Sequence, residues 1–86
     1  MSDDPITVSI YTREDCALCA VAHGTVVRVV DGLDVPVEVD LVDVDDDPEL
    51  AAEYGERVPY VFVDGRPAFK YEVDERELRL KLLAAA

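Results

Sequence analysis

The regular part of the chain begins with a segment in which apolar and polar residues alternate. Residues 6–11 read Ile-Thr-Val-Ser-Ile-Tyr, which is the period-two pattern of a half-buried strand rich in β-branched residues. The spacing then changes to three and four residues, which predicts a helix with one core-facing stripe, formed by Leu18, Val21, Ala22, Thr25 and Val29. Asp15 or Thr12 is the expected N-cap of this helix, and Gly32 is expected to end it in the left-handed conformation.

A second strand and a short helix are predicted next. Residues 35–44 alternate, with apolar side chains at Val37, Val39 and Leu41. Pro48 suits the first position of a helix, and Gly55 is expected to end that helix. The inward-facing residues of this short helix are expected to be Leu50, Ala51 and Tyr54.

The remaining sequence predicts a hairpin and a final helix. Strands over residues 59–64 and 67–73 are joined at Asp64-Gly65, a sequence typical of tight β turns. Residues 74–77 then open a helix whose expected core residues are Leu78, Leu82 and Leu83. The helix between the first two strands is long enough for a right-handed parallel crossover. The order βαβαββα therefore predicts an α/β fold with a four-stranded mixed sheet flanked by three helices.

The length and charge of the chain limit its domain number and its possible partners. The chain has 86 residues, so residues 1–86 are expected to form a single domain. Twenty Asp and Glu residues against eight Lys and Arg residues give a net charge of −12, which argues against nucleic acid and anionic membranes as partners. Two interpretations of the acidity stay open: a docking surface for a basic partner, and adaptation to high salt, where self-repulsion is screened. We favour adaptation to salt, because the acidic residues are spread through every segment.

The sequence also bears on location. No apolar run is long enough to span a bilayer, and residues 1–5 lack the basic and apolar regions of a secretory signal. A cytoplasmic location is therefore expected, and we expect a monomer without a cofactor. In a reducing compartment, two cysteines this close in sequence indicate redox or metal chemistry rather than a structural disulfide.

The two cysteines stand where a thiol is readily activated. Cys16-Ala17-Leu18-Cys19 follows the first predicted strand and opens the first predicted helix. Free backbone N–H groups and the dipole of a helix N-terminus stabilise a thiolate, which is the attacking form of cysteine. Cys16 is expected at the exposed end of the turn, and Cys19 one turn further in. This placement predicts that Cys16 attacks a substrate disulfide and that Cys19 resolves the mixed disulfide.

Charged neighbours act on the first sulfur in opposite directions. Arg13 adds positive charge three residues before Cys16, whereas Glu14 and Asp15 disfavour the thiolate. We therefore expect a moderately lowered pKa for the Cys16 thiol. Arg13 has a second possible role, as a surface residue paired with Glu14 or Asp15.

Metal binding is the main alternative from another class of function. Zinc normally takes four ligands, and beyond the two sulfurs this chain offers only His23, four residues after Cys19. A metal or iron–sulfur carrier would need to share Cys16 and Cys19 across a dimer. A non-catalytic interaction module that keeps the fold is a third alternative.

Val58-Pro59 precedes a strand expected in the middle of the sheet. Proline is disfavoured within a central strand because it has no N–H to donate, so its place at the first residue needs a reason. One explanation is a cis peptide bond facing the cysteines, and the other is an ordinary trans proline that ends the loop after Arg57. The upstream cysteine motif favours the cis form.

These motifs together resemble the glutaredoxin-like branch of the thioredoxin superfamily, over nearly the whole chain. The resemblance is carried by Tyr11-Thr12-Arg13, Cys16-x-x-Cys19, Val58-Pro59, Phe62-Val63-Asp64-Gly65 and Asp74-Glu75-x-x-Leu78, and it is nearest to small Cys-x-Leu-Cys glutaredoxin-like proteins. It implies a thioredoxin-like fold and dithiol–disulfide exchange, with Cys16 as nucleophile, Cys19 as resolving thiol and Pro59 in cis. It also implies that Val58 offers backbone groups to substrate, and Arg13, Val58 and Pro59 are the expected substrate-binding residues.

Two departures from the family pattern concern the potential and the substrate. Glutaredoxins usually carry Pro-Tyr between the cysteines, whereas this chain has Ala17-Leu18, so no reduction potential is assigned. The family's glutathione site uses a Gly-Gly pair and an acidic residue after the hairpin, and residues 66–72 contain no such pair. A protein disulfide or another low-molecular-weight thiol is therefore expected as substrate in preference to glutathione.

Overall fold

A mixed sheet with the strand order β2-β1-β3-β4 forms the centre of the computed structural model, which describes residues 4–86. The elements in chain order are β1 (Ile6–Thr12), α1 (Ala17–Asp31), β2 (Val37–Asp43), the 3₁₀ helix η1 (Val44–Asp46), α2 (Pro48–Tyr54), β3 (Tyr60–Val63), β4 (Arg66–Lys70) and α3 (Glu75–Ala85). The predicted order βαβαββα and the four-stranded mixed sheet with three helices are confirmed. The expectation about the N-terminal segment falls partly on residues 1–3, which lie outside the described residues.

Strand directions bring two distant segments to the same edge of the sheet. β1 runs parallel to β2 and antiparallel to β3, and Tyr11 near the end of β1 pairs with Tyr60 at the start of β3. The loop that leaves β1 and the loop that enters β3 therefore meet at one end of the sheet. The first of these loops leads to Cys16, and the second contains Pro59.

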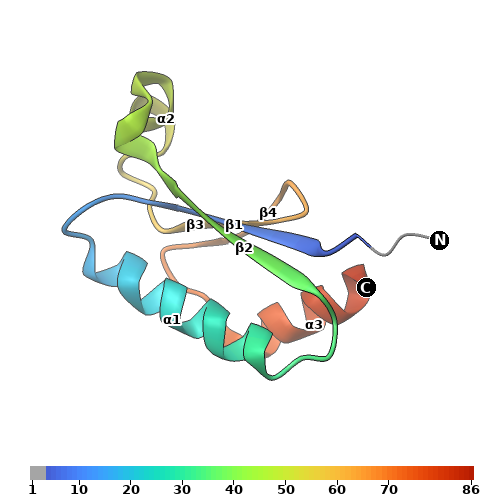
Figure 1. Ribbon diagram of the computed structural model, residues 1–86. Coiled ribbons are helices and arrows are strands. Elements are labelled where there is room, and N and C mark those ends of the chain that lie inside the picture. The colour runs from blue at the N-terminus through green and yellow to red at the C-terminus, as the bar shows by residue number, and fades with distance from the viewer. Residues whose placement is uncertain (1–3) are drawn as a thin grey trace.

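The core lies between the sheet and one layer of helices. Figure 1 shows α1 and α3 on the same face of the sheet, and α2 on the other side, near the end of β2. Alternate residues of β1 and β3 pack against α1 and α3, and the buried cluster comprises Ile6, Val8, Ile10, Val26, Val61, Val63, Leu78 and Leu82. Leu78 and Leu82 are buried as predicted, but Leu83 is 48% exposed, so its assignment to the core was wrong.

Helix α1 buries part of the predicted stripe, because Ala22 and Thr25 are buried and Val29 packs half-buried against the core. Leu18 and Val21 are 50% and 66% exposed, although both were expected to face the core. Cys19 and Val26 are buried in their place. The buried face is therefore rotated from the predicted one by roughly half of the 100° that separates successive residues. The rotation turns Cys19 inward and leaves Leu18 and Val21 at the surface.

The opposite face of the sheet carries an aromatic cluster, formed by Tyr11, Tyr54, Tyr60 and Phe62. The Tyr11 ring lies 4.8 Å from the Tyr54 ring and 5.0 Å from the Phe62 ring, measured between centroids. Tyr54 comes from α2, so these ring contacts attach the short helix to the sheet. Burial among the rings is the main cause that raises the pKa of Tyr54, and the nearby Glu53 carboxylate adds to it. Leu50, Ala51 and Tyr54, which were predicted to face inward, are half-buried. The structure describes every residue of α2, and none of them is fully buried.

The hairpin turn follows the sequence, whereas the C-terminal end of α1 does not. Asp64 and Gly65 have φ values of 49° and 82°, the left-handed pair that a tight hairpin turn requires. Gly32 has a φ of −88°, so the expected left-handed end of α1 is wrong. The N–H of Gly32 donates to the Val29 carbonyl at 3.1 Å, a shorter-range bond that tightens the last turn in place of a left-handed residue. Across residues 4–86, none of the helices combines the length and apolar character needed to cross a bilayer.

Candidate active site

Cys16 itself is the N-cap of α1. Its backbone is extended, with φ −106° and ψ 101°, and its Sγ accepts a hydrogen bond from the Cys19 N–H at 3.1 Å. The expectation that Asp15 or Thr12 caps the helix is therefore wrong. Asp15 adopts a left-handed φ of 59°, which turns the chain so that the next residue reaches the cap position. The sulfur thus occupies the place that a Ser or Asp oxygen takes in most N-caps.

The two cysteines are joined by a disulfide, and their accessibility differs. Their Cα atoms lie 5.2 Å apart, within the range of about 4.4–6.8 Å that a disulfide can span. Cys16 is half-buried, whereas Cys19 is 4% exposed. An incoming reactant therefore meets Cys16 first, which is the asymmetry expected of an attacking and a resolving thiol.

The Val58–Pro59 peptide bond is cis, as predicted. Pro59 is fully buried, and its carbonyl accepts a hydrogen bond from the Tyr71 N–H at 2.7 Å. Val58 is half-buried at the edge of the sheet to which the cysteine loop also leads. The contact of the Val58 backbone with substrate stays a prediction.

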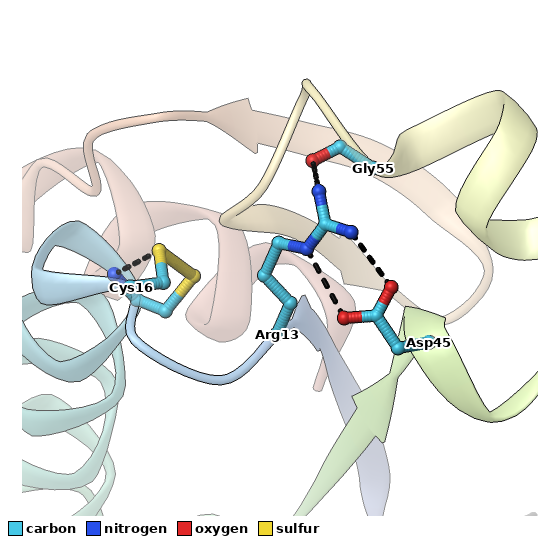
Figure 2. The surroundings of a disulfide bond; sticks show 5 residues. Arg13, Cys16, Asp45 and Gly55 are labelled. Atoms are coloured by element: carbon cyan, nitrogen blue, oxygen red, sulfur yellow. Dashed lines mark hydrogen bonds and ion pairs between the residues drawn. A yellow bond between two sulfur atoms is a disulfide. The ribbon is translucent and has the colours of Figure 1, made fainter.

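Arg13 forms a clamp that the sequence did not predict. Its guanidinium donates to the two carboxylate oxygens of Asp45, at 2.7 and 3.1 Å, and to the Gly55 carbonyl at 2.7 Å. The alternative in which Arg13 pairs with Glu14 or Asp15 is replaced by contacts with η1 and the end of α2. Figure 2 shows the Arg13 side chain turned toward Asp45 and Gly55, with the disulfide on its other side. The hydrogen bonds and charge of Asp45 raise the pKa of the guanidinium, which stays fully charged.

A small hollow of about 210 Å³ connects the clamp to the sulfurs. Its lining includes Arg13, Cys16, Cys19 and His23, so the sequence-predicted candidates of this region do share one surface. His23 faces the same hollow as the cysteines from one turn further along α1. Within residues 4–86, however, no group of three or more His, Cys, Asp and Glu side chains is arranged to hold a metal ion.

Two components of the site were missed by sequence reasoning. Asp45 lies in a run of aspartates that gave no reason to single it out, and Gly55 was assigned only a helix-ending role. A Cβ at Gly55 would lie 3.3 Å from a guanidinium nitrogen of Arg13 and 2.4 Å from the Ala51 carbonyl oxygen. The Ala51 carbonyl oxygen, four residues earlier in the chain, therefore requires a glycine, whereas the contact with Arg13 becomes visible only once distant segments are placed together.

Comparisons with known proteins identify the family of the chain. A family model described as "Glutaredoxin-like domain (DUF836)" matches residues 7–83. The chain is 36% identical over 75 residues to the uncharacterized protein Rv0508 of Mycobacterium tuberculosis, and the match covers 84% of this chain and 77% of that protein.

Solved structures extend the likeness to the three-dimensional level. The X-ray structure of target protein XcR50 from X. campestris has a TM-score of 0.72 at 32% identity, covering 92% of this chain and 97% of the other. A mutant thioredoxin from Halobacterium salinarum has a TM-score of 0.67 at 25% identity, covering 96% of this chain and 76% of the other. With a thioredoxin-like fold and a family match across most of its length, the chain belongs to the glutaredoxin-like domain family (DUF836).

Proposed function

We propose that the protein is a thiol–disulfide oxidoreductase that reduces disulfides through Cys16 and Cys19. The observation that carries this proposal is the position of Cys16, half-buried at the start of α1 with its Sγ accepting the Cys19 N–H. On reduction, the same N–H and the helix dipole would stabilise a thiolate on Cys16. Cys19 is already at bonding distance and shielded from solvent, which suits a resolving thiol.

The reaction requires two exchanges at sulfur. The Cys16 thiolate attacks one sulfur of the substrate disulfide, forms a mixed disulfide and displaces the other sulfur as a thiolate. The Cys19 thiolate then attacks Cys16, closes the intramolecular disulfide and releases the second substrate thiolate. The substrate disulfide gains two electrons and the protein dithiol loses two. An external dithiol restores the reduced protein for the next cycle.

Serine substitutions separate the two roles in a single turnover. Pre-reduced protein is mixed with bis(2-hydroxyethyl) disulfide, and released thiol and protein mass are measured. The wild type should release both substrate thiols and finish with its own disulfide. Cys19→Ser should release one thiol and keep the other as an adduct, whereas Cys16→Ser should release neither, because Cys19 is only 4% exposed.

The reactivity of the first sulfur provides an independent check. The pH midpoint for alkylation of Cys16 in the reduced Cys19→Ser variant should lie below the ordinary thiol value of about 8.5. A midpoint at or above that value would remove the activation on which the proposal depends. Identical behaviour of the two serine variants would show that the roles are wrongly assigned.

A further inference from the structure

A second and larger hollow lies along the first turns of α1. It has a volume of about 570 Å³ and lies between α1 and the segment that joins β4 to α3. Its walls include Leu18, Val21 and Tyr71, which are 50%, 66% and 41% exposed. Phe69 adds a half-buried ring to the wall. We call this hollow the apolar groove.

The apolar groove borders the candidate active site on two sides, although it shares no lining residue with the small hollow at the sulfurs. Leu18 lies between the two cysteines in sequence, so the groove begins at the turn that carries Cys16. On the other side, the Tyr71 N–H donates to the Pro59 carbonyl at 2.7 Å, and the Tyr71 hydroxyl donates to the Glu56 carbonyl at 3.1 Å. These two bonds fix the far wall to the loop that contains the cis proline. The groove is therefore preformed, which lowers the entropy lost on binding.

The charged side chains that line the groove are acidic on balance. Glu72 and Asp74 belong to the lining. Lys70 is the cation of the lining, and its Nζ lies 5.4 Å from the centroid of the Tyr71 ring. The local balance is thus acidic, in the same sense as the net charge of −12 for the whole chain.

We propose that the apolar groove binds a polypeptide substrate that has apolar residues next to its disulfide cysteine and basic residues flanking them. The inference rests on the proposed function, because the groove selects what reaches Cys16. Exposed Leu18 and Val21 gain by covering an apolar side chain, and the acidic rim attracts basic residues. A second copy of the chain would bring a charge of −12 against the same rim, and a small anionic thiol would offer no apolar side chain.

Matched synthetic probes test each part of this specificity. Each probe is a short peptide whose cysteine is joined by a disulfide to the coloured thiol 5-thio-2-nitrobenzoate. The first peptide has Leu beside the cysteine and Arg at both ends. A second replaces Leu with Gly, and a third replaces Arg with Glu. A mixed disulfide of 2-mercaptoethanol with the same coloured thiol serves as the small reference.

In each reaction the protein dithiol supplies two electrons, and the products are the coloured thiolate, the Cys16–Cys19 disulfide and a second thiol, which is the peptide thiol or, for the small reference, 2-mercaptoethanol. The Leu probe should react about tenfold faster than the Gly probe at every salt concentration, because apolar burial is not screened. The Arg probe should exceed the Glu probe by about tenfold at low salt. That advantage should fall toward unity at about 1 M salt, where the Debye length is about 3 Å.

Two valine variants on the same helix locate the effect. Val21→Ser should lower the ratio of Leu-probe to Gly-probe rates by about threefold, because it removes part of the groove wall. Val27→Ser makes the same change on α1 at a residue that is 37% exposed and does not line the groove. This control should leave the ratio unchanged.

Each outcome supports or overturns a distinct claim. Equal rates for the Leu and Gly probes in the wild type would overturn the claim that the groove binds an apolar side chain. An equal change of the Leu-to-Gly rate ratio in Val21→Ser and Val27→Ser would overturn it as well. If the rate per protein molecule decreases as protein concentration rises, and Val21→Ser removes that decrease, the groove binds a second copy of the chain. Failure with every probe, the small reference included, would instead contradict the proposed function.

Discussion

Arg13 illustrates how a residue near the candidate site is held by partners that are distant in sequence. Its guanidinium is held by Asp45 and by the Gly55 carbonyl, although it lines the same small hollow as Cys16. A positive charge closer to the sulfur would favour the thiolate. We therefore expect the clamp to limit how strongly Arg13 favours a thiolate on reduced Cys16.

Asp45→Asn tests this role of the clamp. The substitution removes the negative charge that holds Arg13, so the guanidinium is freer to approach Cys16. We expect the pH midpoint for Cys16 alkylation to move down, and the alkylation rate at neutral pH to rise severalfold. The midpoint is measured with iodoacetamide on the Cys19→Ser background.

A double substitution separates the effect of Arg13 from the loss of the carboxylate itself. In an Arg13→Met background, Asp45→Asn should shift the alkylation midpoint much less than it does in the presence of Arg13. Equal shifts in both backgrounds would show that Asp45 acts on the sulfur directly, and that the clamp has no part in setting its reactivity.

At the scale of elements, the position of α2 depends on a few close contacts with the rest of the fold and not on fully buried side chains. Its aromatic contact comes from Tyr54, and its end is fixed where the Gly55 carbonyl meets Arg13. Gly55 has a φ of −53°, which any residue adopts, so backbone freedom does not explain the glycine. The explanation is the Ala51 carbonyl oxygen, which a Cβ would meet at 2.4 Å.

Gly55→Ala should therefore destabilise the protein, and Gly24→Ala provides the matched control. The added methyl at residue 55 forces the end of α2 away from Arg13, and overpacking of this kind costs about 1–3 kcal/mol. Gly24 lies inside α1 with no atom within 4 Å of an added Cβ, so the same change there should stabilise by up to about 1 kcal/mol. Urea unfolding measures both, and two variants of equal sign would contradict the contact argument.

The strands and their order were predictable because their signals are local. Alternation over β1 and the Asp64-Gly65 turn each need only neighbouring residues, and the structure confirms both. The rotation of α1 was not predictable in the same way. Two overlapping stripes are both apolar enough, and packing against the sheet selects the one that contains Cys19 and Val26 over the one that contains Leu18.

The residues of the candidate site also fall into two groups, those that a local motif predicts and those that it does not. Cys16, Cys19 and Pro59 stand out because each belongs to a short motif, and their placement was expected from sequence. The partners of Arg13 are 32 and 42 residues away in sequence, so no local pattern identifies Asp45 or Gly55. The apolar groove was missed for a related reason, since Leu18 and Val21 were assigned to the core.

At the scale of the whole molecule, the dominant feature is the net charge of −12. The folded chain measures 37 × 24 × 15 Å and has a radius of gyration of 12.7 Å. A Debye length of about 30 Å at 0.01 M salt leaves repulsion active across this entire volume, whereas about 3 Å at 1 M removes most of it. An unfolded chain of this length has a radius of about 30 Å, which spreads the same charge more widely.

Salt has two opposing effects on the stability of this protein. Their balance decides whether stability rises or falls as salt is added. The exposed ion pairs Arg13–Asp45 and Arg28–Glu75 weaken with salt, but exposed pairs contribute little. Relief of repulsion among twelve excess negative charges should exceed that loss, so the urea midpoint should rise between 0.01 and 1 M sodium chloride. Neutralising two exposed acids of β2, with Glu38→Gln and Asp40→Asn, should raise the midpoint at low salt and change it little at high salt. A midpoint that falls with salt would mean that the ion pairs outweigh the net charge.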